Sequence, residues 1–88
     1  MERADDWGEA LRPHSIVDAG AEEWPAVRRS IERRMQGLTV GELLEVISSQ
    51  RRNRVEIPIW CFLVDHDLLR LLATESTTRF WIRKAPER

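Results

Sequence analysis

The segment from Val55 to Val64 constrains the fold of this chain more than any other stretch. It reads Val-Glu-Ile-Pro-Ile-Trp-Cys-Phe-Leu-Val and is followed by the polar residues 65–67. A membrane-spanning helix needs about 20 apolar residues, so this shorter run predicts a buried or interfacial helix instead. Proline is tolerated in the first helical turn, because the amide that it lacks has no partner there. We therefore expect the helix to be entered through Pro58.

This predicted helix is apolar on both of its faces. At about 100° per residue, one arc of the helix faces the core. The core arc holds Ile57, Trp60, Cys61 and Val64. The outer arc, where a surface helix is normally polar, holds Ile59, Phe62 and Leu63. The outer arc is more apolar surface than a small monomer needs, so these three residues are candidates for contact with a protein partner or a second copy.

Length and composition limit the chain to one small globular domain. A chain of 88 residues buries only about 60% of its unfolded surface. With 42% hydrophobic and 33% charged residues, the composition is not that of a disordered protein. The single cysteine permits no internal disulfide, which fits a reducing cytoplasm. Neither a signal segment nor a membrane span is visible, so we expect a cytoplasmic protein without membrane contact.

The net charge of −1 argues against a general polyanion binder, although the charges are unevenly distributed. Residues 1–23 carry seven acids and two arginines, whereas residues 24–54 carry seven arginines and three acids. Residues 1–13 lack apolar periodicity and end in a proline, so we expect a flexible acidic lead-in, in which Trp7 has no evident role. Residues 14–85 are then the single folded domain.

Hydrophobic periodicity predicts six elements in this domain. Strands are expected at 15–19, 41–48, 68–74 and 78–84, and helices from 24 to Gly37 and around the central run, with Asn53 as a candidate N-cap. The order β-α-β-α-β-β predicts an α/β (α+β) two-layer sandwich, with two helices on one face of a four-stranded mixed sheet. The other sheet face would be open. The apolar residues with the parity to lie there are Leu43, Ile47, Leu72 and Trp81.

Four segments carry a resemblance to a known family. They are Gly41-Glu42-Leu43-Leu44-Glu45-Val46, Glu56-Ile57-Pro58-x-Trp60-Cys61, Asp65-His66-Asp67-Leu68 and Arg79-Phe80-Trp81-Ile82-Arg83-Lys84. In order and spacing they resemble the G-E-x-L-x-V, D-I-P-x-[FW]-C, G-H-E-L and [YF]-R-[FY]-x-I-R-K segments of the TusA/SirA/YedF-like sulfur-carrier proteins. The resemblance covers residues 17–84 and implies the same two-layer fold.

The resemblance also implies a sulfur relay, in which a cysteine of a Cys-Pro-x-Pro motif carries a persulfide from a cysteine desulfurase to an acceptor. That cysteine begins the first helix, where unpaired amides favour a thiolate. Counting back from Gly41 places the cysteine position at Trp24 and the first proline at Pro25. An indole cannot hold a persulfide, and no cysteine precedes Cys61. Trp24 is then either a cap on the core or an anchor for a partner.

Cys61 is the remaining thiol, and two interpretations apply to it. It is a substitute sulfur carrier, or it is a small apolar core residue in mid-helix, which the helical spacing favours. His66 is a general base or a residue of the helix end, and its angular distance from Cys61 excludes a local dyad. One cysteine and two histidines make no zinc signature, so no metal and no cofactor are expected.

The arginines of the middle segment suggest a third role. They are Arg28, Arg29, Arg33, Arg34, Arg51, Arg52 and Arg54. They form either a basic patch for nucleic acid or a solvated helix face, and Glu32 among them favours the second. The sequence thus leaves three hypotheses. The first is a non-catalytic protein-binding or assembly module, with Arg28 and Arg29 among its contact residues and sulfur-relay proteins among its possible partners. The others are a carrier that uses Cys61 and a nucleic-acid binder.

Overall fold

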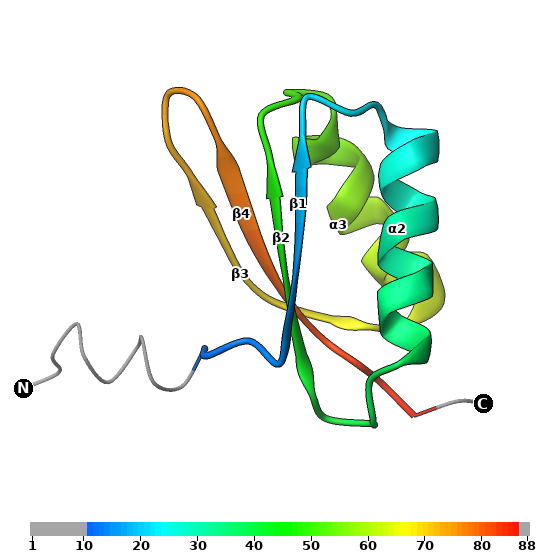
Figure 1. The fold of residues 1–88 in the computed structure, drawn as a ribbon. Coiled ribbons are helices and arrows are strands. Elements are labelled where there is room, and N and C mark those ends of the chain that lie inside the picture. Colours follow the sequence, from blue (N-terminus) through cyan, green and yellow to red (C-terminus); the bar gives the residue numbers. More distant parts are fainter. Residues whose placement is uncertain (1–10, 87–88) are drawn as a thin grey trace, which may run out of the picture.

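The computed structural model describes residues 11–86, which form two layers (Figure 1). The elements in chain order are β1 (Ser15–Gly20), α2 (Trp24–Gln36), β2 (Leu43–Ser48), α3 (Asn53–Val64), β3 (Asp67–Ala73) and β4 (Thr78–Arg83). The predicted element order and fold class are confirmed. The predictions for Trp7 and for most of the lead-in fall on residues 1–10, outside the described part of the chain.

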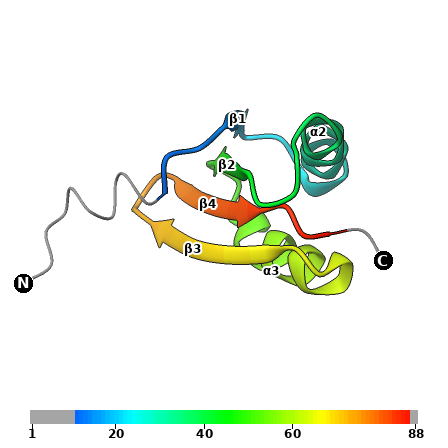
Figure 2. The same cartoon turned by 90° about the horizontal axis from the view of Figure 1, so that it is seen from below.

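The sheet is mixed and has the strand order β1-β2-β4-β3. β1 runs parallel to β2, whereas β4 runs antiparallel to both β2 and β3. Both helices lie on the same face of the sheet (Figure 2). α2 contacts β1 and β2, while α3 contacts β3. The two chain segments that resemble the family's helices therefore lie side by side over one sheet face.

The main core fills the space between the helices and the sheet. In α2, the predicted stripe at four-residue spacing is buried, and Gly37 follows the last helical residue as its C-cap. Buried side chains from all layers form the cluster: Val17, Ala19, Val27, Ile31, Met35, Leu38, Leu44, Val46, Ile57, Trp60, Cys61, Phe80 and Ile82. Phe80 and Ile82 face the helices, as the alternation in β4 predicted. One core prediction is wrong: Val64, the last residue of α3, is exposed, because the helix ends there beyond the edge of the core.

The start of α3 differs from the prediction. The helix begins at Asn53, five residues before Pro58, so the proline lies inside the helix rather than at its entrance. At this position Pro58 leaves the carbonyl of Arg54 without its usual helical donor, because proline has no amide hydrogen. The helix tolerates this because its core face, with Ile57 and Cys61, is fully packed against the sheet.

Asn53 is also not the N-cap, a position that Arg52 occupies. Its side chain is completely buried instead. The amide nitrogen Nδ2 donates to the carbonyl of Glu22 at 3.1 Å and to Ser48 Oγ at 2.9 Å. Asn53 therefore joins the loop before α2, the end of β2 and the start of α3, a tertiary role that local sequence patterns do not report.

The second sheet face is less open than expected. Leu43 and Trp81, predicted to be unpartnered there, are buried together beneath Leu11. They lie on that face as predicted, but the chain before β1 returns over it and covers them. The surroundings are charged: Arg79 pairs with Glu45 at 3.5 Å, and the guanidinium of Arg70 lies 5.8 Å from the centre of the Trp81 ring. Of the other two predicted residues, Ile47 is half-buried and Leu72 is exposed.

Candidate functional site

Cys61 lies in the core rather than at a reactive position. Its side chain is 2% exposed in the third turn of α3, where the helical spacing predicted a core residue. Burial raises the pKa of the thiol to about 12, because the thiolate would lose its hydration. Mid-helix, its sulfur has no free helix amides beside it. The thiol is therefore protonated at neutral pH and shielded from reagents.

Trp24 is the first residue of α2 and is half-buried. It packs against the main core and meets the ring of Trp60 edge to face, with ring centroids 6.4 Å apart and planes at 65°. Pro25 follows in the first turn, where the missing amide costs nothing. Of the two interpretations for Trp24, the cap on the core thus has a direct packing partner, and part of the indole remains accessible.

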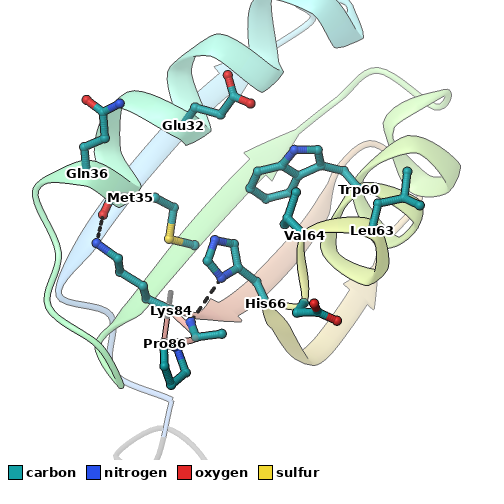
Figure 3. Close-up of a pocket in the computed structure, with 11 residues that line it drawn as sticks. Glu32, Met35, Gln36, Trp60, Leu63, Val64, His66, Lys84 and Pro86 are labelled. Carbon is teal, nitrogen blue, oxygen red and sulfur yellow. Dashed lines mark hydrogen bonds between the residues drawn. The ribbon is translucent and has the colours of Figure 1, made fainter. Parts of the chain in front are cut away.

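A row of aromatic rings runs from α2 to the end of α3. Beyond Trp24, the ring of Trp60 lies 5.5 Å from the imidazole of His66. The row borders a cleft of about 800 Å³ between the two helices, into which His66 and Trp60 project (Figure 3). The cleft is lined by Glu32, Met35, Gln36, Trp60, Leu63, Val64, Asp65, His66, Lys84, Ala85 and Pro86. Sequence patterns missed this cleft, because its walls come from three separate segments.

The polar groups of the cleft serve the fold. Lys84 Nζ donates to the carbonyls of Met35 and Leu38, at 2.7 Å each, and so caps the C-terminal end of α2 (Figure 3). His66 Nδ1 accepts a hydrogen bond from the amide of Ala85 at 3.0 Å. Burial, and then the nearby charge of Lys84, lower the pKa of His66. A neutral His66 that holds the chain after β4 fits the structural interpretation better than a general base.

Several predicted arginines are used within the domain. Arg28 pairs with Glu32 at 3.1 Å along α2. Arg34 donates to Ser15 Oγ and to the carbonyl of Ile16, and Arg54 donates to Thr78 Oγ1 and to the carbonyl of Thr74. The remaining members, Arg29, Arg33, Arg51 and Arg52, are exposed. The arrangement is that of charged residues on a solvated surface, three of which brace neighbouring elements.

The outer face of α3 is apolar and uncovered. Ile59, Phe62 and Leu63 are 50%, 80% and 70% exposed, as the helical projection predicted. Exposed aromatic and leucine side chains of this kind mark interaction surfaces more often than monomer surfaces. Among residues 11–86, no cluster of histidine, cysteine and acidic residues could hold a metal ion. Within the same residues, no helix is long and apolar enough to cross a membrane.

A two-layer β-α-β-α-β-β domain, with a proline-bearing first helix and the four segments in register, defines the class of small sulfur-carrier-like proteins. Comparison with known proteins gives the family. The chain is 30% identical over 79 residues to "Sulfur carrier protein TusA" of Pseudomonas savastanoi pv. phaseolicola, covering 90% of this chain and 94% of that protein. Proteins of the same name from Pseudomonas putida F1 and Pseudomonas syringae pv. syringae are 32% and 35% identical, over 82% and 86% of this chain and 90% of each relative.

This chain belongs to the TusA sulfur-carrier family. No family model matches it. The similarity spans nearly the whole domain, so the shared feature is the fold rather than a single motif.

Proposed function

We propose that this chain is a TusA-family domain that acts as a non-catalytic protein-binding or assembly module and does not carry sulfur. The relatives bear the name of sulfur carriers, and a carrier needs an accessible thiolate. The single observation that carries the proposal is the state of Cys61. It is the only cysteine of the chain, it is buried, and its pKa is raised to about 12.

The position of Trp24 supports the same proposal. We assign Trp24 to the place of the family's carrier cysteine, because it begins the first helix and precedes Pro25. The first-turn amides of a helix lower the pKa of a thiol, but an indole gains nothing from them. Trp24 also packs against Trp60, so the large side chain fits its surroundings. On this proposal the helix start keeps the family's architecture without the nucleophile.

The binding role rests on the apolar face of α3. Ile59, Phe62 and Leu63 give the partner an uncharged contact surface, while Trp24, Arg28 and Arg29 flank the start of α2 as further contact candidates. Family membership makes the proteins of a sulfur relay the first partners to test. We propose a cytoplasmic location on the same grounds, since the relays that the family serves act on reduced thiols.

The proposal is tested by sulfur loading. The protein is incubated with a cysteine desulfurase and L-cysteine, and its intact mass is measured without reductant. In a carrier, the thiolate attacks the sulfane sulfur of the desulfurase persulfide, and the desulfurase thiolate leaves. We expect no mass gain for the wild-type chain or for Cys61→Ser. A gain of one sulfur atom that is absent from Cys61→Ser would establish Cys61 as a carrier and overturn the proposal.

A matched variant makes a negative result informative. In the Cys61→Ser background, Trp24→Cys returns a thiol to the start of α2. We expect this variant to gain one sulfur atom, because the helix N-terminus favours its thiolate and the side chain there is partly accessible. Loading of this variant alone would show that the desulfurase recognises the scaffold and that the missing thiol explains the inactivity of the wild-type chain.

A further inference from the structure

We infer that β3 is the centre of a two-fold interface, in which it pairs antiparallel with β3 of a second copy of this chain. The inference rests on the proposed binding role of α3 and names the occupant of that surface. It does not depend on whether Cys61 carries sulfur. The argument begins with the two edges of the sheet, β1 and β3, because each edge strand presents main-chain groups without a neighbouring strand.

The β1 edge is protected within the molecule. Arg34 of α2 donates to the carbonyl of Ile16 at 2.8 Å and to Ser15 Oγ at 2.7 Å, so its guanidinium covers main-chain and side-chain acceptors of β1. A register shift between Asp18 and Gly20 further disrupts this strand. Side-chain cover and irregularity are the devices by which proteins prevent an edge from pairing with another chain.

The β3 edge has a different character. β3 is the longest strand, with seven residues, and in the described part of the chain it pairs with β4 alone. Its leucines Leu69, Leu71 and Leu72 are 38%, 39% and 42% exposed. A register shift near Leu68 disturbs only its first half. A long, leucine-rich edge with exposed side chains is a surface that readily accepts another strand.

The charged residues of β3 do not oppose such pairing. Asp67 forms an ion pair with Arg83 at 3.0 Å, and the guanidinium of Arg70 lies over the ring of Trp81. Both charges are thus engaged with β4 of the same molecule, and they have opposite signs. In an antiparallel pair of identical strands, the chain directions are opposed, so the first half of one strand lies beside the second half of the other.

The apolar face of α3 continues from this edge. Pro58 and Phe62 of α3 line a groove with Leu68 and Leu69 of β3, so the helix and the edge strand form one surface. A two-fold axis perpendicular to the sheet beside β3 would bring the two α3 helices together on the same side of a continuous eight-stranded sheet. Phe62, 80% exposed in one copy, would then be covered. A second copy supplies both matching parts at once, a strand edge and an apolar helix, because a two-fold interface is made of the same residues on each side.

The experiment is sedimentation equilibrium of the full chain, from about 1 μM to about 1 mM. We expect a reversible dimer. Leu71→Lys should weaken the dimer at least about tenfold, because two lysines would meet near the centre of the paired strands. The matched control is Ile16→Lys, which places the same charge at an equally exposed residue of the protected β1 edge and should leave the dimer unchanged. Circular dichroism melting of each variant establishes that it is folded.

Amide hydrogen exchange adds a second readout. We expect the outer amides of β3 to exchange faster in folded Leu71→Lys than in the wild-type dimer, while those of β2 do not change. A monomer at every concentration would overturn the inference, and so would a dimer that survives Leu71→Lys and is broken only by Phe62→Lys. Neither result changes the expected outcome of sulfur loading, so the two proposals fail separately.

Discussion

Trp24 and Trp60 meet edge to face with their ring centroids 6.4 Å apart. The pair joins the first turn of α2 to the middle of α3, and the ring of Trp60 continues the contact to His66 at the end of that helix. The residue that we assign to the sulfur-carrying position therefore has a packing partner of its own. Trp24 replaces a reactive group with a contact that holds the two helices together.

This contact is measurable by a double-mutant cycle. We expect Trp24→Ala to lower the free energy of unfolding by about 2 kcal/mol, less than a fully buried tryptophan would cost, because the side chain is half-buried. The coupling between Trp24→Ala and Trp60→Leu should be about 0.5–1.5 kcal/mol, beyond the area that each ring buries. Urea denaturation of the four proteins provides the values. Additive effects of the two changes would contradict a direct contact.

The thiol of Cys61 should react only when the structure opens. In native protein at pH 8, we expect a bulky aromatic disulfide reagent to label Cys61 at a rate set by unfolding, because the side chain is buried and its pKa is raised to about 12. Labelling in urea should be complete within the mixing time. The variant Trp24→Cys in the Cys61→Ser background is the control and should react promptly in native protein. Prompt labelling of native wild-type protein would contradict the buried position.

His66 should make stability depend on pH. Burial lowers its pKa in the folded protein from 6.5, so the unfolded chain binds more protons in the range just below 6.5. The free energy of unfolding therefore rises with pH through that range and is lost as pH falls toward the folded pKa. The pKa of Glu42 is also lowered, chiefly by its hydrogen bond from the Thr39 amide, but this effect lies below 4.5. Measurements between pH 5.5 and 7.5 thus isolate the histidine.

The variant His66→Gln tests this assignment. Glutamine retains an acceptor for the amide of Ala85 and cannot take up a proton. We expect its unfolding free energy to vary less between pH 7.5 and 5.5 than that of the wild-type protein, as measured by urea denaturation at each pH. An equal pH dependence in both proteins would assign the effect to another group.

The fold was predictable because local patterns and the global structure agree. Four-residue spacing in α2 and alternation in β4 reflect the face that each element buries, and these periods are visible in sequence. The start of α3 was not predictable from them. Asn53 begins this helix while its side chain donates to Glu22 and Ser48, and these partners are distant in sequence and adjacent only after folding.

The site was predictable in part for the same reason. Burial of Cys61 and exposure of Phe62 follow from helical spacing alone. The cleft beside Trp60 and the cap by Lys84 on the carbonyls of α2 depend on the packing of separate segments, so no local pattern indicates them. The cover that Leu11 provides for Trp81 likewise comes from a segment without periodicity.

Asp65 holds a backbone conformation that glycine adopts more easily. It follows α3 with φ 64° and ψ 23°, in the left-handed region, while the amide of His66 donates to the carbonyl of Cys61 at 3.0 Å to close the helix. The family's Gly-His-Glu-Leu segment, which residues 65–68 resemble, has glycine at this place. A side chain costs about 1 kcal/mol relative to glycine here, because its Cβ crowds the backbone.

Comparing two variants isolates this cost. Asp65→Gly and Asp65→Ala both remove the carboxylate and whatever it contacts, so they differ only in the Cβ atom. We expect Asp65→Gly to be more stable than Asp65→Ala by about 1 kcal/mol in urea denaturation. Since glycine also gains freedom in the unfolded chain, the measured difference is a lower bound on the strain that the helix end imposes. Equal stability would mean that the chain after Val64 relaxes out of the left-handed conformation when the aspartate is lost.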